Sequence, residues 1–206
     1  MKGILIVVSG FAGAGKGTIM NRLISEYPDY ALSVSATSRS PRPGEQEGIN
    51  YFFKTREEFE DMIGKDEFLE YAEYVGNYYG TPRAFVDRKL NEGKNVLLEI
   101  EIQGAMQIKE KYPEALLVFV MPPSARELKD RLTKRGTETE DVIEKRMKRA
   151  VSESEGIENY DYIVINEDVD KCTALLHNII QSAACTPSRQ KDFIEKIRTD
   201  LRNTEW

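Results

Sequence analysis

Short apolar segments recur along this chain, and stretches with helix-type spacing of polar and charged residues lie between them. The apolar segments are Ile4 to Val8, Asn95 to Ile100, Ala115 to Val120 and Tyr162 to Ile165. Segments of this length and composition are typical of buried strands. Because strands and helices alternate, the pattern predicts one α/β domain with a parallel sheet flanked by helices.

Two regions interrupt this alternation. Residues 35–83 open with a loop rich in Ser, Thr, Arg and Pro, and continue with a helix near Arg56 to Lys65 and tyrosine-rich strands. Residues 124–155 begin with Ser124, a residue type that caps helices, and are dense in charges of both signs. We expect both to be insertions into a core made of residues 1–34, 84–123 and 156–206.

The last segment, Thr186 to Trp206, has a pattern of its own. Phe193, Ile197 and Leu201 are spaced four apart, which predicts one amphipathic helix. Its apolar side either packs against the core or bridges subunits of a homo-oligomer. The sequence leaves both alternatives open.

Composition narrows the class of protein. Of the 206 residues, 40% are hydrophobic and 31% are charged, and no apolar run suits a membrane span. The N-terminus has no signal-peptide pattern, so we expect a cytoplasmic protein. The net charge of −6 disfavours nucleic acid as a partner. Two cysteines and one histidine suggest neither a zinc site nor a disulfide framework, and we expect both thiols to be buried and reduced.

A glycine-rich loop follows the first apolar segment directly. It reads Ser9-Gly10-Phe11-Ala12-Gly13-Ala14-Gly15-Lys16-Gly17-Thr18, and helical spacing resumes after it. Its glycines allow a tight turn whose amide hydrogens converge near a helix N-terminus, and Lys16 adds a full positive charge. Although a flexible turn is the alternative, the strand before and the helix after predict a binding site for nucleotide phosphates. Gly17 stands where such loops usually place a magnesium-binding Ser or Thr.

A second basic loop contains Arg39 and Arg42, held out of helical conformation by Pro41 and Pro43. Two guanidiniums on a stiff loop can bind a phosphate dianion, although an isolated basic turn is often merely solvated. Phosphoryl transfer needs an acceptor site beside the donor site, which favours phosphate binding here. Nearby tyrosines serve either core packing or ligand contact, and the sequence does not decide between these roles: Tyr51, Tyr71, Tyr74, Tyr78 and Tyr79.

The ordered motifs resemble the P-loop nucleoside monophosphate kinases, and among them the guanylate kinases. The resemblance covers nearly all of residues 3–182 and rests on T-S-R-S-P-R-P-G-E, F-L-E-Y, G-N-Y-Y-G-T, E-I-E-I-Q-G, R-G-T-E-T-E and I-V-I-N. It implies a P-loop NTPase-type fold with a GMP-binding lobe over 35–83 and a helical lid over 124–155. It also implies ATP-dependent phosphorylation of GMP to GDP with Mg²⁺, so that ATP and GMP are the expected partners.

The resemblance also implies an acceptor site. The GMP phosphate would be held by Arg39, Arg42, Tyr51 and Tyr79, whereas Ser35, Glu70 and Thr81 would face the guanine. The chemistry of guanine supports Glu70, because one carboxylate can accept the adjacent ring NH and amino group, while Thr81 meets the carbonyl. Adenine presents the opposite pattern, so a site of this kind rejects it.

Two further acidic positions depart from the family pattern. Glu99 and Glu101 stand where the family usually has aspartates, at the end of a central strand and on one face of it. The resemblance implies Glu99 near the magnesium waters and Glu101 near the guanine amino group. Solvated strand-end carboxylates are the alternative. With Gly17 in the loop, we expect the metal to be held through water, with Thr18 or Glu99 nearby.

The donor side completes the expected site. The loop residues Gly10 to Thr18 would bind ATP, and the resemblance implies that Arg131 and Arg135 of the lid and Asn166, near the adenine, would bind it as well. We expect the catalytic residues to be Lys16, Arg39, Arg135 and Arg146, and we expect Arg149 to be simply exposed. No general base is needed, since the attacking phosphate oxygen is already anionic.

Two other functions remain compatible with the sequence. Guanylate-kinase-like domains also occur as peptide-binding modules, which usually lack a working P-loop. A kinase of the same class could instead phosphorylate AMP or another small phosphorylated acceptor. Lys16 favours an enzyme over a binding module, and Glu70 with Thr81 favours GMP as the acceptor.

Overall fold

A five-stranded parallel sheet forms the centre of the computed structural model, which describes residues 2–74, 76–134 and 139–204. The strand order is β2-β7-β1-β8-β9, and every neighbouring pair is parallel. Four of these strands lie within a few residues of the predicted segments, which confirms the α/β class; β2 was not predicted. Their bounds are β1 (Leu5–Gly10), β2 (Tyr30–Leu32), β7 (Asn95–Glu99), β8 (Leu116–Met121) and β9 (Tyr162–Ile165).

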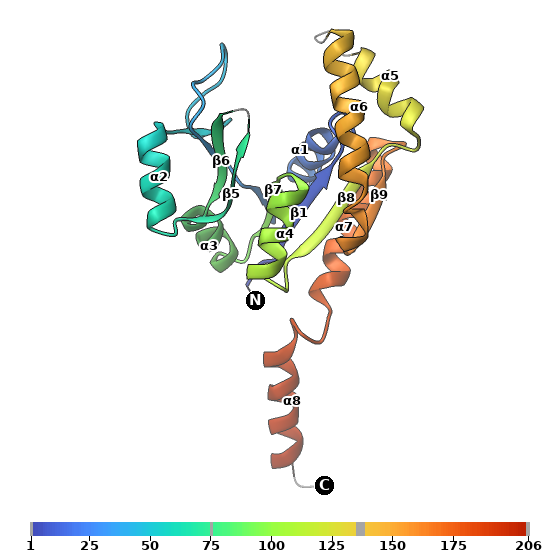
Figure 1. Ribbon diagram of the computed structural model, residues 1–206. Helices are drawn as coiled ribbons and strands as arrows, with labels where there is room; N and C mark the ends of the chain where they lie inside the picture. The colour runs from blue at the N-terminus through green and yellow to red at the C-terminus, as the bar shows by residue number, and fades with distance from the viewer. Residues whose placement is uncertain (1, 75, 135–138, 205–206) are drawn as a thin grey trace.

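Successive side chains of β1 enter two different hydrophobic clusters. Ile6 and Val8 pack with α1 (Lys16–Glu26) and α7 (Val169–Ala184), whereas Leu5 and Val7 pack with α3 (Arg83–Asn91) and α4 (Ile102–Lys111). Because side chains alternate along a strand, helices must cover both faces of the sheet. Figure 1 shows these helix pairs on either side of β1 and β7.

A second, smaller sheet lies within residues 36–82. Its order is β4-β3-β6-β5, formed by Phe52–Phe53, Ala36–Thr37, Asn77–Pro82 and Phe68–Tyr74 respectively. The helix α2 (Arg56–Gly64) begins with a capping box of Thr55 and Glu58 and places Phe59 against this sheet. Helix α4 joins the sheet to the core, because Lys111 Nζ donates to the Leu69 carbonyl oxygen at 3.0 Å.

Two charged helices stand across the carboxyl ends of the central strands from the small sheet (Figure 1). They are α5 (Ala125–Lys134) and α6 (Glu140–Ser154), and a short 3₁₀ turn, Ile157–Asn159, follows them. Ser124 Oγ accepts a hydrogen bond from the Glu127 amide at 3.1 Å, as a capping residue would. Arg135, a predicted catalytic and ATP-binding residue, lies outside the described residues.

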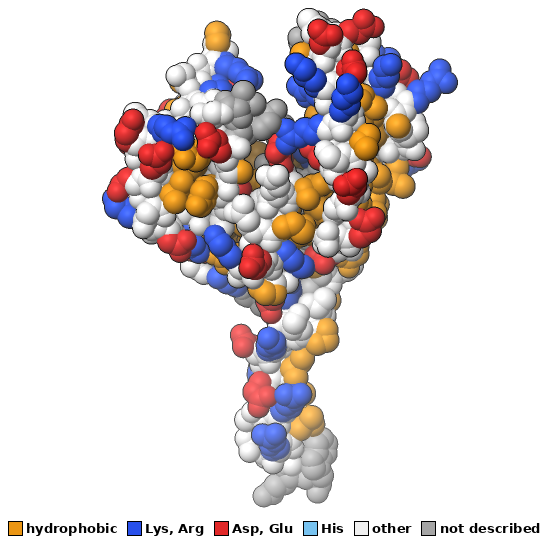
Figure 2. Space-filling model, in the orientation of Figure 1, with side chains coloured by type: hydrophobic (Ala, Val, Ile, Leu, Met, Phe, Trp, Pro, Cys, Tyr) orange, Lys and Arg blue, Asp and Glu red, His pale blue; other side chains and the backbone are white. Residues whose placement is uncertain are grey.

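The C-terminal helix α8 (Lys191–Asn203) extends away from the domain (Figure 1). All of its residues are described and none is buried. Its apolar side chains lie along one side of it in Figure 2, with Phe193, Ile197 and Leu201 exposed to 59%, 40% and 52%. The predicted helix is present. Of the two alternatives for its apolar side, packing against the core does not occur among the described residues. Among the described residues, no helix combines the length and apolar character that a membrane crossing requires.

The histidine contacts neighbouring aromatic side chains, and the two cysteines differ in burial. His177 stacks on Tyr27 with ring centroids 3.8 Å apart, and its Nδ1 lies 2.8 Å from the hydroxyl of Tyr30. Cys172 is buried as expected, but Cys185 is exposed, because it is the C-cap residue of α7 and follows the last buried turn.

Candidate active site

Two adjoining cavities open at the carboxyl ends of β1 and β7. The larger, of about 670 Å³, lies between the glycine-rich loop, the segment after β2 and helix α6, and the smaller, of about 300 Å³, lies under the second sheet. Open α/β sheets place ligands at this edge. Five residues line both cavities: Ser35, Tyr51, Glu99, Ile100 and Glu101.

Backbone geometry explains the glycines of the loop. Gly10 has φ +153°, and a Cβ there would lie 2.0 Å from the Val120 carbonyl oxygen of the neighbouring strand. Gly15 has φ +91° at the start of α1, and a Cβ would lie 2.3 Å from Asn166 Nδ2. A side chain at Gly10 would displace strand β8, and one at Gly15 would displace Asn166, the residue that follows β9. The loop therefore keeps its tight path between β1 and α1.

Lys16 brings positive charge to the larger cavity. Its Nζ donates to the carbonyl oxygens of Gly10 at 2.7 Å and Phe11 at 3.3 Å, and it is the first residue of α1, whose amino end is also positive. Such a loop suits phosphate groups. Phe11, expected in the ATP site, instead packs its ring edge-on against Phe119 in the core at 5.2 Å. The loop residues that line the cavity are Gly10, Ala12 and Lys16; Gly13, Ala14, Gly15, Gly17 and Thr18 do not.

Asn166 and Arg131 support the glycine-rich loop through hydrogen bonds. Asn166 is 4% exposed, and its Nδ2 donates to the Ala14 carbonyl oxygen at 2.7 Å. Arg131 Nη2 donates to the carbonyl oxygen of Asn166 at 2.8 Å, and its Nε donates to Glu127 at 2.9 Å. Neither residue lines the two cavities. Both side chains hold the loop in place in this structure.

Glu99 is the acidic group beside the glycine-rich loop. Its Oε2 lies 3.7 Å from the point that a Cβ on Gly17 would occupy, whereas Thr18 is exposed on the first turn of α1. Among the described residues, no group of three or more acidic, histidine or cysteine side chains is placed to hold a metal. Mg²⁺ usually takes one or two carboxylates together with substrate phosphates and water, and a single carboxylate next to a phosphate loop fits that donor set.

Glu70 is a buried carboxylate at the wall of the smaller cavity. It is 5% exposed, and its Oε1 accepts a hydrogen bond from Thr81 Oγ1 at 2.6 Å. Burial raises the pKa of Glu70, and the hydrogen bond from Thr81 opposes that rise. Thr81 is itself fully buried and does not line the cavity. Its hydroxyl therefore holds Glu70 in this structure, where the sequence predicted a direct contact with guanine.

In the basic loop, the two arginines contact a carboxylate of the same loop. Both oxygens of Glu45 accept hydrogen bonds from the Arg39 guanidinium, at 2.9 and 3.0 Å, and Glu45 Oε2 also accepts from the Arg42 amide at 2.7 Å. The Arg39 hydrogen bond is the main cause that lowers the pKa of Glu45. The sequence predicted a phosphate in this fork, and a carboxylate occupies it. Arg42 is exposed, and neither arginine lines the cavities.

Two tyrosines connect this loop with the cavities. Arg39 lies over the ring of Tyr51 at 5.5 Å, and the rings of Tyr51 and Tyr79 meet edge-on at 6.0 Å. Tyr51 lines both cavities and Tyr79 lines the smaller one. The ring of Tyr51 therefore lies between Arg39 and the cavities.

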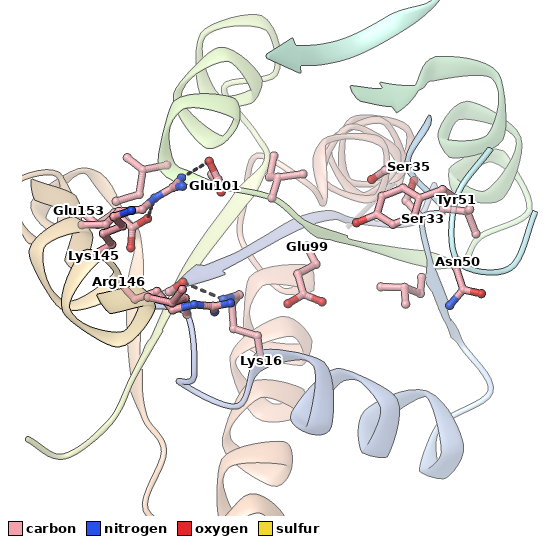
Figure 3. Close-up of a pocket in the computed structure, with 18 of the residues that line it drawn as sticks. Lys16, Ser33, Ser35, Asn50, Tyr51, Glu99, Glu101, Lys145, Arg146 and Glu153 are labelled. Atoms are coloured by element: carbon pink, nitrogen blue, oxygen red, sulfur yellow. Dashed lines mark hydrogen bonds and ion pairs between the residues drawn. The ribbon is translucent and has the colours of Figure 1, made fainter. Parts of the chain in front are cut away.

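Helix α6 supplies the opposite wall of the larger cavity. Lys145, Arg146, Arg149 and Glu153 all line it. Lys and Arg side chains gather along α6 beside the hollow in Figure 2, and Figure 3 shows Arg146 and Lys16 directed to the same part of the cavity. The expectation that Arg149 is exposed is wrong: it is half-buried and forms an ion pair with Glu101. The partner lies on a distant segment, which helical spacing does not reveal.

Several lining residues were not selected from the sequence. The four-residue spacing of Lys145, Arg149 and Glu153 places them on one helix face, a signal that was available. Ser33 Oγ is buried and has no hydrogen-bond partner within the part of the chain that is described. Gln103 and Gly104 belong to the motif E-I-E-I-Q-G, of which only the two glutamates were selected, whereas Ser33 and Asn50 enter through tertiary packing.

Known proteins resemble this chain over almost its whole length. The family model described as "Guanylate kinase" matches residues 2–183. A guanylate kinase of Clostridioides difficile strain 630 is 53% identical over 201 residues, covering 97% of this chain and 98% of the relative. One from Caldanaerobacter subterraneus subsp. tengcongensis is 51% identical over 199 residues, covering 97% of each chain.

A solved structure agrees with these relatives. The crystal structure of guanylate kinase from Anaplasma phagocytophilum superposes with a TM-score of 0.74 at 34% identity. The match covers 91% of this chain and 89% of that one. By sequence and by fold, the chain belongs to the guanylate kinase family.

Proposed function

We propose that this protein transfers the terminal phosphoryl group of ATP to the phosphate of GMP, giving ADP and GDP. One observation carries the choice of acceptor: a buried carboxylate, Glu70, faces a cavity that adjoins the Lys16 cavity. Guanine presents two neighbouring N–H donors to such a carboxylate. The family membership supports the same reaction.

In this proposal the larger cavity holds the donor. Lys16 and the amides of the loop from Gly10 to Thr18 bind the phosphates of ATP, and Asn166 keeps that loop in position through Ala14. Arg131, Arg135 and Arg146 belong to the lid, residues 124–155, and offset the charge that spreads over the transferring group. Lid closure would also exclude water, which otherwise competes as acceptor.

The acceptor would occupy the smaller cavity, under the lobe formed by residues 35–83. Glu70 accepts the ring NH and the amino group of guanine, and Thr81 keeps the carboxylate oriented through the 2.6 Å hydrogen bond. Ser35 and Glu101 complete the guanine contacts. Arg39 exchanges Glu45 for the GMP phosphate, which Arg42, Tyr51 and Tyr79 also contact.

The chemistry then needs positioning more than proton transfer. An oxygen of the GMP phosphate attacks the terminal phosphorus of ATP, a new P–O bond forms, and the bond to the ADP oxygen breaks in line with it. Lys16, Arg39, Arg135 and Arg146 stabilise the charge of this transition state. The central sheet and the helices α1, α3, α4 and α7 that cover it would hold the two phosphate sites in register.

Glu99 would hold Mg²⁺ through water, with Thr18 nearby on the first turn of α1. Gly17 brings no hydroxyl to this place, so water molecules held by Glu99 and the ATP phosphates would provide the oxygen ligands. The ion, when bound, supplies positive charge to the donor phosphates. ATP binding, measured in calcium-free buffer with and without magnesium, would give the contribution of the ion to ATP affinity separately from turnover.

Parallel assays of ADP formation with ATP and GMP, AMP, CMP or UMP test the function. We expect turnover with GMP and little with the other three monophosphates. Turnover with AMP in place of GMP would refute the role of Glu70. An absence of turnover with every acceptor, in protein that binds peptides, would favour the non-enzymatic module.

A further inference from the structure

An ion pair between Arg149 and Glu101 joins helix α6 to the segment that follows β7. Arg149 Nη2 contacts Glu101 Oε2, and the dashed line at Glu101 in Figure 3 marks this pair. Glu101 is the N-cap residue of α4 and lines both cavities, whereas Arg149 lines the larger one. The pair therefore connects the lid to the place where the two cavities meet.

Arg149 also binds a second carboxylate, that of Glu153. Its Nε donates to Glu153 Oε1 at 2.8 Å, one helical turn further along α6. The Glu153 side chain is 20% exposed and the Arg149 side chain 35% exposed, so both are partly shielded from solvent. Two carboxylates thus fix the plane of the guanidinium, which an exposed arginine would not keep.

Glu101 needs such a partner more than a shorter acid would. Its side chain is 59% exposed and has several rotatable bonds, so on its own it would sample many orientations. Arg149 engages Oε2, and this leaves Oε1 as the atom that a ligand donor would use. The charge of Arg149 also offsets one of the three carboxylates around the smaller cavity, those of Glu70, Glu99 and Glu101.

We infer that Arg149 is a positioning residue for the acceptor: it orients Glu101 toward the amino group of guanine. This inference rests on the proposed function. Arg149 differs in role from Arg146, which shares a part of the cavity with Lys16 (Figure 3). An arginine that is already shared between two carboxylates is a weaker phosphate ligand than one directed at the phosphate loop.

Steady-state kinetics of Arg149→Gln with GMP and with inosine monophosphate test the inference. Inosine monophosphate lacks the amino group, so only GMP uses the proposed contact. We expect KM for GMP to rise about fivefold, as for loss of a partly exposed charge pair. KM for inosine monophosphate, KM for ATP and kcat should change less than twofold, and Arg149→Lys should restore part of the GMP affinity.

Two comparisons separate positioning from other roles. Lys148→Gln removes a positive charge from the neighbouring position of α6, where Lys148 pairs with Glu144 at 2.6 Å in solvent, and should leave all constants unchanged. In a Glu101→Gln background, Arg149→Gln should add no further rise in KM for GMP. Binding of GMP alone, by calorimetry, should follow the same order of variants. Thermal unfolding of each variant shows whether the fold is retained, and if Arg149→Gln is unfolded, Arg149→Lys and Glu101→Gln carry the test.

An equal loss for both monophosphates, or a fall in kcat at unchanged KM, would overturn the inference and assign Arg149 to phosphate binding. An unchanged KM for GMP would overturn it as well. A wild-type protein that does not phosphorylate GMP would instead refute the proposed function, and the positioning role would fall with it.

Discussion

Glu70 reaches its buried position because Gly104 has no side chain. Oε2 of Glu70 lies 2.7 Å from the point that a Cβ on Gly104 would occupy, and its Cδ lies 3.2 Å from that point. Glu70 belongs to β5 of the small sheet and Gly104 to α4 of the core. The carboxylate that we assign to guanine is thus placed by a glycine on another element.

Replacing this glycine should damage acceptor binding selectively. In Gly104→Ala the new methyl group would displace the Glu70 carboxylate, and we expect kcat/KM for GMP to fall roughly tenfold or more, as for a misplaced reactant. KM for ATP should not change. Gly64→Ala in α2 is the matched control, because a Cβ there meets nothing within 4 Å. Wild-type GMP kinetics in Gly104→Ala would show that Glu70 is free to move.

The raised pKa of Glu70 predicts a pH dependence of acceptor binding. Guanine donors require the ionised carboxylate, and burial raises the pKa above the ordinary value of 4.5. KM for GMP should therefore rise as the pH falls through this raised pKa. Glu70→Gln should lower kcat/KM for GMP by roughly 10²-fold or more and abolish this dependence. A pH profile that is identical in wild type and variant would assign the titration to another group.

The same shift has a signed effect on folding. Because the folded-state pKa exceeds the unfolded value, the contribution of Glu70 to stability is fully present below the unfolded pKa. It is lost as the pH rises through the folded pKa. Denaturant unfolding from pH 4 upward should show wild type losing stability relative to Glu70→Gln across this range.

Lys16 is expected to be necessary for transfer and dispensable for folding. In this structure its Nζ is satisfied by two loop carbonyl oxygens, which phosphates would replace. Lys16→Ala should lower kcat by roughly 10³-fold or more, the scale of a lost transition-state charge. Its thermal midpoint should stay near that of the wild type. Lys196→Ala on α8 controls for loss of one charge, and high activity in Lys16→Ala would contradict the mechanism.

Asn166 is expected to contribute to stability as well as to ATP binding. Asn166→Ala leaves the Ala14 carbonyl oxygen without its buried donor, which costs about 1–3 kcal/mol of unfolding free energy. KM for ATP should rise, because the loop loses its support. Asn159→Ala, which removes an exposed hydrogen bond to Gly156, should change neither quantity. If Asn166 served only the adenine, denaturant unfolding would be unchanged.

Local patterns in the sequence predicted most of the fold. The four longer strands of the central sheet each contain a run of apolar residues, and the glycine-rich loop marks the turn between β1 and α1. The three residues of β2 include only one that is buried, so they carry no such pattern. The sequence also left open where the apolar side of α8 lies, because an apolar helix face does not specify what covers it.

The candidate site likewise contains some residues that the sequence predicted and others that it did not. Lys16 and Glu70 follow from motif and ligand chemistry, but Gly104 and Arg149 act through residues far away in the sequence. The pairing of Arg39 with Glu45 has a different reason. A guanidinium fork binds whichever anion is near, and a carboxylate of the same loop is near it here.

Helix α8 should unfold independently of the rest of the protein, so the cooperative folding unit does not include it. It has 13 residues, none of them buried, and isolated helices of about this length are marginal in water. Its amide hydrogens should therefore exchange with solvent much faster than those of α7, where Leu176 and Ile180 are fully buried. Opening of α8 exposes almost no additional apolar surface, so it should leave the denaturant m-value of the central sheet unchanged.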